Sequence, residues 1–250
     1  MPLITLVERA RAVWESLAGV PVVFAPAMRV AVSPRSRLCP PGWVGLVVIA
    51  DAAIATAPDP RTAHIIEHAL SAVPAASVTD ANLLHRNLAI SDMLGPATLA
   101  YLDPADFRPP DAPAVIEQLD ARDPTFWQFW SQVDAADLSE SGIDQITSPA
   151  FTVREHGQIT AAAGYRDWPG EVAHLSVLTA LPVRGRGLAR AVASAAVSHA
   201  LRENKLPQWR ARPEASRHIA QVLGFRELGS QVSICLPKSP ACEVGTSERA

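Results

Sequence analysis

The chain has 250 residues, which suffices for one large domain or two modest ones, and we expect two. Hydrophobic residues make up 48% of the chain and charged residues 19%, a composition that indicates a globular protein and excludes a disordered one. The net charge of -3 and the pI near 6.2 provide no broad cationic field, so we expect no nucleic-acid partner.

The three cysteines are an odd number without a Cys-x-x-Cys spacing, which favours neither a disulfide framework nor a zinc site, and we expect no metal. A reducing cytoplasm fits this usage best. Charged residues, Glu8 and Arg9, occur near the beginning of the given sequence. The basic start and following apolar run of a secretory signal are not found there. The most apolar early stretch, Trp43 to Ala50, is far shorter than the roughly 20 residues that cross a bilayer, so we expect no membrane partner.

Residues 1–113 are predicted to form a smaller N-terminal α/β domain of unknown role. The apolar residues of Leu6 to Leu17 recur at the three-and-four spacing of an amphipathic helix. Further helices are predicted at Arg61 to Val73 and Asp80 to Asp92. Valine-rich runs separated by Pro, Ser and Gly predict strands at Val22 to Phe24, Met28 to Val32 and Val44 to Ala50. The proline-rich segment Asp103 to Pro113 is predicted to be the linker that ends this domain.

Residues 114–237 show a more regular pattern and are predicted to form the second α/β domain. Alternation around Glu155 to Gln158 predicts a β-hairpin, and the next strand, Glu171 to Thr179, is apolar on both faces and so lies inside a sheet. The remaining elements are a helix at Pro124 to Val133, a long helix after Gly187, a strand at Gln208 to Ala211, a helix from Pro213 to Gly224, and a closing strand at Gln231 to Leu236. Residues 238–250 are predicted to be a mobile tail.

The loop between the apolar strand and the long helix carries the main functional signal. Its residues are Arg184, Gly185, Arg186, Gly187, Leu188 and Ala189, followed by Arg190. Successive backbone N–H groups, two glycines without side chains and the positive end of a helix dipole suit a diphosphate. Arg186 and Arg190 are placed to add contacts to phosphate, although solvated side chains fit the sequence equally well.

Two other nucleotide sites are excluded by spacing. A P-loop needs Gly-Lys-Ser/Thr, and none follows Gly187. A dinucleotide fingerprint needs a third glycine or alanine and a later acidic residue, where this chain has Arg190 and Pro207. A glycine-containing surface turn remains the alternative to a binding loop.

Residues Ala150 to Leu236 resemble the GNAT superfamily of N-acetyltransferases. The family signature Arg/Gln-x-x-Gly-x-Gly/Ala is met by Arg184, Gly187 and Ala189 between a strand and a helix. Ser216 and the run Leu223-Gly224-Phe225 lie where the family places its second coenzyme-binding helix and the strand that follows. The resemblance implies a mixed-sheet α/β fold that binds acetyl-CoA as co-substrate, with the smaller α/β domain before it.

The resemblance also implies that an amine attacks the thioester directly in a ternary complex. Backbone N–H groups of Val177, Leu178 and Thr179 are expected to bind the acetyl carbonyl. His174 is the preferred candidate for the general base because its ordinary pKa is close to neutrality, and a histidine packed inside the sheet is an equal alternative. Glu171 is the second candidate and would need burial or an intervening water.

The general acid is the least defined part of this mechanism. The family often uses a tyrosine where this chain has Ala220, and Ser216 or His218 are the candidates to replace it. Departure of the thiolate without an acid is also open, because a thiolate is a reasonable leaving group near neutral pH.

The expected function is therefore transfer of an acetyl group to an amine on a small molecule or peptide. A non-catalytic module that binds or senses acyl-CoA is the alternative, motivated by Ala220. For the acceptor, Glu140 and Asp144 could attract an amine and Tyr165 and Trp168 could form an apolar wall, with core packing and a solvated turn as the alternatives.

Overall fold

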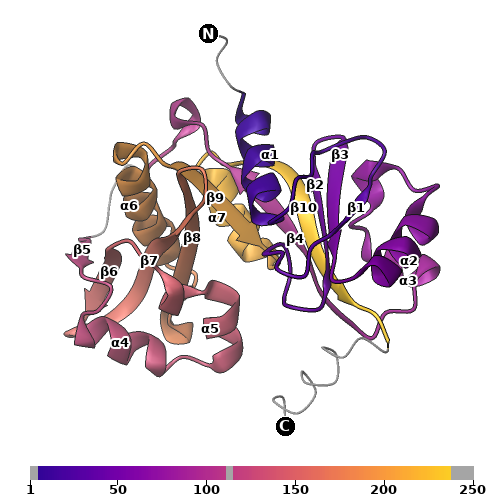
Figure 1. Ribbon diagram of the computed structural model, residues 1–250. Helices are drawn as coiled ribbons and strands as arrows, with labels where there is room; N and C mark the ends of the chain where they lie inside the picture. The colour runs from indigo at the N-terminus through magenta and orange to yellow at the C-terminus, as the bar shows by residue number, and fades with distance from the viewer. Residues whose placement is uncertain (1–4, 111–114, 238–250) are drawn as a thin grey trace. The chain divides into compact units, whose positions relative to one another are not determined.

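A computed structural model describes residues 5–110 and 115–237 of the chain (Figure 1). The chain forms two compact units, one made of Met1–Leu99 together with Glu227–Ala250 and the other of Ala100–Arg226. The first unit is therefore built from both ends of the chain, and the second from its middle. Both units combine helices with β-strands, and the expected α/β class is confirmed.

The first unit contains a mixed sheet with strand order β1-β3-β2-β10-β4. Strands β1 and β3 are parallel, whereas β2 is antiparallel to both β3 and β10. Its elements are α1 (Leu6–Leu17), β1 (Val30–Val32), β2 (Val44–Ile49), β3 (Ala52–Ala57), α2 (Pro60–Leu70), α3 (Ala81–Asn87), β4 (Asp92–Tyr101) and β10 (Arg226–Cys235). The last two residues of β4 belong to the second unit.

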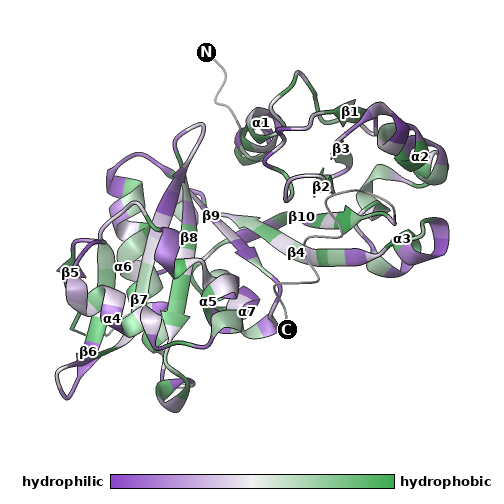
Figure 2. Cartoon of the chain, turned by 60° about the horizontal axis from the view of Figure 1, so that its bottom comes forward, coloured by the Kyte–Doolittle hydropathy of each residue, from purple (hydrophilic) through white to green (hydrophobic). Residues whose placement is uncertain are grey.

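The core of the first unit follows from burial of its central hairpin. All six residues of β2 and all six of β3 are buried, so these strands have no solvent-facing side. Helix α2 buries Ala63, Ile66 and Leu70 at helical spacing, and Figure 2 shows its mixture of hydrophobic and hydrophilic residues. Helix α1 begins with a capping box in which the Thr5 and Glu8 side chains each bind the other's backbone N–H.

The second unit contains a mixed sheet with strand order β9-β8-β7-β6-β5. Only β8 and β9 run parallel among the pairs β5/β6, β6/β7, β7/β8 and β8/β9. Its elements are β5 (Glu117–Leu119), α4 (Pro124–Ser131), α5 (Ala135–Ser141), β6 (Ala150–Glu155), β7 (Gln158–Trp168), β8 (Val172–Thr179), α6 (Leu188–Arg202), β9 (Leu206–Ala211) and α7 (Glu214–Val222).

Two hydrophobic cores lie on opposite faces of this sheet. One contains Ala173 and Leu175 of β8 with residues of α6 and α7, and the other contains Leu178 of β8 with Phe126 and Phe129 of α4. This division follows the alternation of side chains along β8. Figure 1 shows α6 along one face, with α4 and α5 on the other. Residues at even positions of β8 therefore face α4 and α5.

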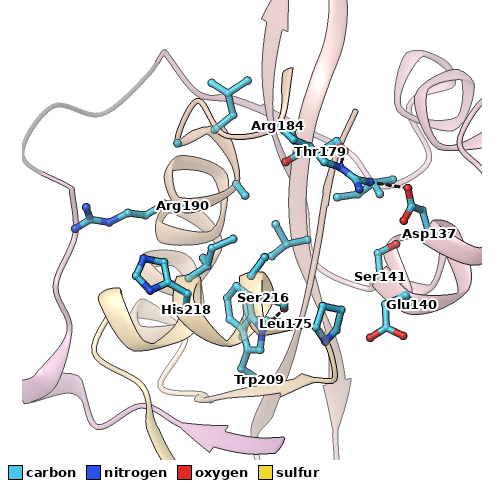
Figure 3. A pocket seen from close by; sticks show the side chains of 18 of the residues that line it. Asp137, Glu140, Ser141, Leu175, Thr179, Arg184, Arg190, Trp209, Ser216 and His218 are labelled. Carbon is cyan, nitrogen blue, oxygen red and sulfur yellow. Dashed lines mark hydrogen bonds and ion pairs between the residues drawn. The ribbon is translucent and has the colours of Figure 1, made fainter. Parts of the chain in front are cut away.

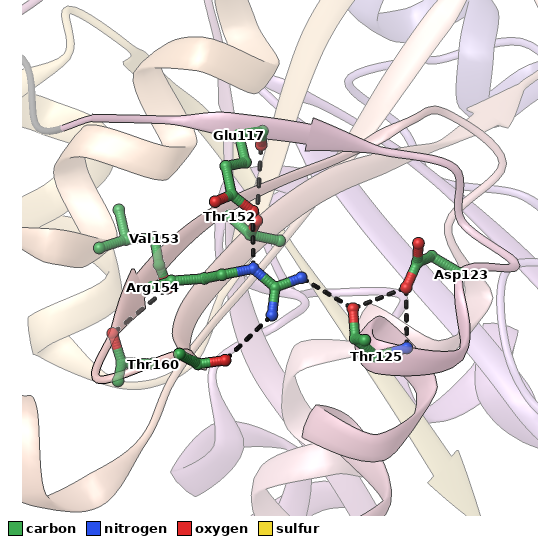
Figure 4. Close-up of polar contacts among 8 residues, drawn as sticks. Glu117, Asp123, Thr125, Thr152, Val153, Arg154 and Thr160 are labelled. Atoms are coloured by element: carbon green, nitrogen blue, oxygen red, sulfur yellow. Dashed lines mark hydrogen bonds and ion pairs between the residues drawn. The ribbon is translucent and has the colours of Figure 1, made fainter.

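Arg154 ties the outer strands to the start of α4 (Figure 4). Its Nε donates to Glu117 Oε2 at 2.6 Å and one Nη donates to Thr125 Oγ1 at 2.8 Å. Asp123 caps α4 by accepting from the backbone N–H of Thr125 at 2.7 Å. These contacts hold β5 and α4 against β6. Strand β7 separates this region from β8 and β9.

Most expected elements are confirmed, with boundary shifts of a few residues. The structure adds three strands and one helix that the sequence analysis did not predict: β3, β4, β5 and α5. The strand expected at Val22 to Phe24 is wrong: this segment forms no strand, and the adjacent Ala25 makes an isolated bridge to Ala53. The closing strand at Gln231 to Leu236 is also corrected, because β10 pairs with β2 in the sheet of the first unit.

The units divide at 99/100 and 226/227, whereas the sequence analysis placed the boundary at 113. Part of the expected linker belongs to the second unit: Pro104–Asp106 is a 3-10 helix, and Arg108 N–H donates to Leu223 O at 3.0 Å. The end of that linker, 111–113, and the expected tail, 238–250, lie outside the described residues. Among those described, no helix combines the length and apolarity that a membrane crossing requires.

Candidate coenzyme and acceptor site

The two edges of β8 differ in how far they are paired. With β7, pairing runs over eight positions, from Ala161↔Thr179 to Trp168↔Val172. With β9, the parallel register covers only Val172↔Leu206, Ala173↔Pro207 and His174↔Gln208. Both strands continue beyond this point, β8 to Thr179 and β9 to Ala211, so they separate toward their carboxyl ends.

The unpaired edge of β8 presents backbone groups from alternate residues. Leu206 N–H donates to Glu171 O at 2.7 Å, which places the odd-numbered residues of β8 toward β9. Ala180 N–H donates to Thr160 O at 2.9 Å, so even-numbered residues bond toward β7. Val177 and Thr179 therefore direct their backbone groups into the opening, whereas Leu178 directs its own toward β7.

The loop after β8 ends at the first turn of α6. Gly185 and Gly187 have φ of +81° and +79°, the left-handed region that glycine adopts without strain, and a Cβ at either position would meet nothing within 4 Å. Gly187 is the N-cap residue of α6, and no side chain caps this helix. The first N–H groups of α6 thus remain available for an anionic ligand.

A cavity of about 590 Å³ lies in the second unit between these features (Figure 3). It is lined by the open end of β8, the loop and first turn of α6, one face of α7, the end of β9 and part of α5. The predicted coenzyme-binding residues that line it are Val177, Leu178, Thr179, Arg184, Gly185, Gly187, Leu188, Ala189, Arg190 and Ser216. One predicted residue, Arg186, is not among the lining residues.

The loop arginines have different partners. Arg184 donates to Asp137 Oδ2 at 2.6 Å and to Thr179 O at 3.0 Å, joining the loop to α5 and to the end of β8. Arg186 makes two hydrogen bonds to the Glu155 carboxylate, at 2.7 and 2.9 Å. Arg190 lines the cavity, and its buried Nε has no hydrogen-bond partner within the described part of the chain.

Ser216 lies on α7 and accepts a hydrogen bond from Trp209 Nε1–H at 3.0 Å (Figure 3). Trp209 is 4% exposed and packs edge-on against Phe225. The Ser216 hydroxyl is thereby positioned at the cavity wall. Ala220 is buried on the same helix and faces the core, while His218 is exposed and lines the cavity.

The structure places His174 on the face of β8 that is covered by α4 and α5. Its ring stacks on Trp168 with centroids 4.2 Å apart, and its Nδ1 hydrogen-bonds Gln208 Oε1. Desolvation, followed by the charge of Arg210, lowers the pKa of His174 to about 3. His174 is not among the cavity-lining residues, and its role as general base stays a prediction.

Glu171 lies in the turn before β8 with φ of +55° and an exposed side chain. Its carboxylate is 3.9 Å from Lys205 Nζ. It also does not line the cavity, so the structure brings Ser216 to the cavity but neither of the two proposed bases. The catalytic role of Glu171 stays a prediction as well.

The sequence analysis missed several lining residues. Asp137 and Ser141 come from α5, whose N-cap Asp134 and C-cap Gly142 were the local signal for a short helix. Trp209 and Arg210 come from a strand that was predicted but not assigned to the site. Glu140 was proposed to attract an amine, and in the structure it pairs with Arg212.

The parallel pair β8/β9 opens beside the uncapped, glycine-flanked start of α6, and the cavity lies between these features. Residues 150–230 match the family described as GNAT acetyltransferase. The match runs from β6 through α7 into the first residues of β10, and it supports the GNAT acetyltransferase domain that the sequence resemblance implied. No curated protein matches the chain.

Three solved structures of GNAT-family proteins are similar to part of this chain. A GNAT-family protein from Novosphingobium aromaticivorans has 20% identity and a TM-score of 0.47, with 58% of this chain and 65% of that chain covered. A GCN5-related N-acetyltransferase from Kribbella flavida has 17% identity and a TM-score of 0.47, with 66% of each chain covered. A GNAT-family acetyltransferase from Colwellia psychrerythraea has 12% identity and a TM-score of 0.48, with 76% and 80% covered. The chain thus spans slightly less than two thirds of the length of the first two.

Proposed function

We propose that the second unit transfers an acetyl group from acetyl-CoA to an amine. The observation that carries this proposal is the unpaired edge of β8, which opens into a cavity continuous with the start of α6. An extended pantetheine arm can occupy the strand opening, and the coenzyme diphosphate can accept hydrogen bonds from the loop and the first turn of α6.

In the proposed reaction the amine nitrogen attacks the thioester carbonyl carbon, and the carbonyl oxygen becomes an oxyanion. Backbone N–H groups directed into the opening, from Val177 or Thr179, are placed to stabilise that oxyanion. Collapse of the tetrahedral intermediate breaks the carbon–sulfur bond and releases the coenzyme A thiolate. The acceptor nitrogen gives up one proton to water, and the amide product results.

The departing thiolate needs little assistance in this scheme. A thiol has an ordinary pKa near 8.5, so its anion is a moderate leaving group close to neutral pH. Ser216 is the hydroxyl group at the α7 wall, and its oxygen already accepts from Trp209. We propose Ser216 as a donor to the thiolate, because its O–H donates to no other group in the described part of the chain.

A second function, binding of acyl-CoA without turnover, is favoured by the buried Ala220 in place of the usual tyrosine. The two functions are separated by incubating the full chain with acetyl-CoA and a broad panel of amines and measuring free thiol. Amine-dependent thiol release supports the transferase. Acetyl-CoA binding without release for any amine supports the binding module, and absence of binding contradicts both.

A further inference from the structure

The side chain of Arg210 extends from β9 to the side of the sheet opposite Trp209. Trp209 is 4% exposed and packs in the core formed with α6 and α7. Because side chains alternate along a strand, Arg210 faces the side covered by α5. Arg210 is exposed and lines the cavity. It therefore lies on the α5 side of the opening, away from the loop and first turn of α6, where we propose that the diphosphate binds.

The acidic residues of α5 are already engaged by other arginines. Asp137 pairs with Arg184 at 2.6 Å, and Glu140 pairs with Arg212. Each of these pairs is neutral overall. Arg210 has no ion pair or hydrogen bond with any residue that the structure describes, so its charge is the unbalanced one on this side of the cavity.

The surroundings of Arg210 favour an additional anion. Arg210 keeps solvent access, but the protein atoms around its guanidinium partly desolvate it; this desolvation and then the charge of Arg212 lower the pKa of Arg210, while Glu140 acts in the opposite direction. Glu140 therefore lies within range of both arginines but forms its hydrogen bond with Arg212. Two cations and one carboxylate leave a net positive charge of one, which a single monoanionic group would neutralise.

We propose that Arg210 binds the carboxylate of the acceptor, so that the substrate class is small amines bearing a carboxylate, such as amino acids. One unbalanced guanidinium matches a monoanionic carboxylate better than a dianionic phosphate, and its planar fork can bind both carboxylate oxygens. The cavity of about 590 Å³ must also hold part of the coenzyme, which limits the acceptor to a small molecule. Neutralisation of Asp137 and Glu140 removes the charges that a polycationic amine would need.

This inference rests on the proposed acetyltransferase function. Its test compares amino acids with the corresponding amino acid amides, which keep the amine and the side chain but lack the carboxylate. Thiol release is measured for each pair at saturating acetyl-CoA, with the wild-type chain and with Arg210→Gln and Arg210→Lys. Arg202→Gln, an exposed substitution at the end of α6 outside the cavity, is the matched control.

The wild type and Arg202→Gln should use the amino acid with kcat/KM about 10- to 100-fold higher than the amide, the range expected for a charge-assisted hydrogen-bonded pair. Arg210→Gln should remove this preference mainly through KM, and Arg210→Lys should restore part of it. Acetyl-CoA affinity should change by less than about threefold in all variants.

Equal use of amino acids and amides by the wild type would overturn the inference while leaving the acetyltransferase function intact. A loss of acetyl-CoA affinity in Arg210→Gln would assign the residue to the coenzyme and also overturn it. If no acceptor is turned over, the melting temperature is measured with N-acetyl amino acids in the presence of coenzyme A. An increase that is the same in the wild type and in Arg210→Gln would overturn the inference. Failure of the wild type to bind acetyl-CoA contradicts the proposed function itself.

Discussion

The two edges of β8 show how one strand contributes both to the core and to the site. Its edge toward β7 is paired over eight positions, and the side chains around it are packed. Its edge toward β9 is paired at three positions and then opens into the cavity. A substitution on the paired edge should therefore lower the free energy of unfolding, whereas a substitution on the open side should weaken acetyl-CoA binding.

The largest expected effect is on the paired edge, at Gly164 of β7, which lies opposite Ser176. A Cβ there would lie 2.6 Å from Ile146 Cδ1 and 3.0 Å from Ser148 Oγ. Gly164→Val should lower the free energy of unfolding by about 3 kcal/mol, because this site has no room for the added atoms. Urea denaturation measures the loss.

The smaller Gly164→Ala should lose less stability than the valine variant. Once folded, both should bind acetyl-CoA with affinity within about twofold of the wild type. A stable Gly164→Val that fails to bind would contradict the separation of the two edges.

On the open side, Gly187→Ala should weaken acetyl-CoA binding by about 10- to 100-fold, because its methyl group would occupy the approach of the diphosphate to the start of α6. Isothermal titration measures this change. Gly157→Ala is the matched control, since Gly157 has φ of +80° and open space around a Cβ but lies in the β6–β7 turn. Both variants should lose about 1 kcal/mol of stability from the left-handed backbone, and equal binding by the two would refute the loop assignment.

His174 should make stability depend on pH. With a pKa of about 3 in the folded chain against 6.5 for the ordinary group, it binds fewer protons when folded than when unfolded. Its contribution is therefore complete above pH 6.5 and is lost as the pH falls toward 3, by roughly 1 kcal/mol per pH unit. Between pH 6.5 and 5.5 the wild type should lose more stability than His174→Gln, measured by urea denaturation at each pH.

The same variant tests His174 as general base. A histidine with a pKa of about 3 stays neutral between pH 6 and 9 and so causes no change of rate in that range. We therefore expect the pH at which turnover is half-maximal to be the same in the wild type and in His174→Gln. A displaced midpoint, measured with an identified acceptor, would establish the base role that the sequence predicts.

The smallest expected effect is at Ser216. Ser216→Ala removes the acceptor of the Trp209 Nε1–H and should lower the melting temperature by an amount equivalent to about 1 kcal/mol. If the hydroxyl also donates to the departing thiolate, thiol release should fall by roughly tenfold with acetyl-CoA affinity unchanged. A normal rate in the destabilised variant would leave Ser216 with a structural role alone.

The loop and its helix were predictable because their signals are local. Gly185 and Gly187 adopt the left-handed conformation that the strand-to-helix connection needs, and the apolar spacing that follows marks α6. Strand β3 was not predictable in this way. Its alanines favour helices intrinsically, and its strand conformation depends on pairing with β2 and complete burial.

The acceptor side of the cavity depends on contacts between distant parts of the chain. Asp137 and Arg184 are 47 residues apart, and Glu140 and Arg212 are 72 apart. Helix α5 has seven residues and too few apolar positions to produce a periodic stripe. No local pattern could therefore predict that Glu140 is neutralised by Arg212 while Arg210 has no ion-pair partner among the residues described.

The central claim is that the open edge of β8 and the start of α6 bind acetyl-CoA, and amide hydrogen exchange tests it most directly. Addition of acetyl-CoA should slow exchange in residues 184–190 and at the end of β8, while residues 44–57 of the first unit stay unchanged. Unchanged exchange over 184–190 at saturating acetyl-CoA, or protection confined to the first unit, would contradict the account.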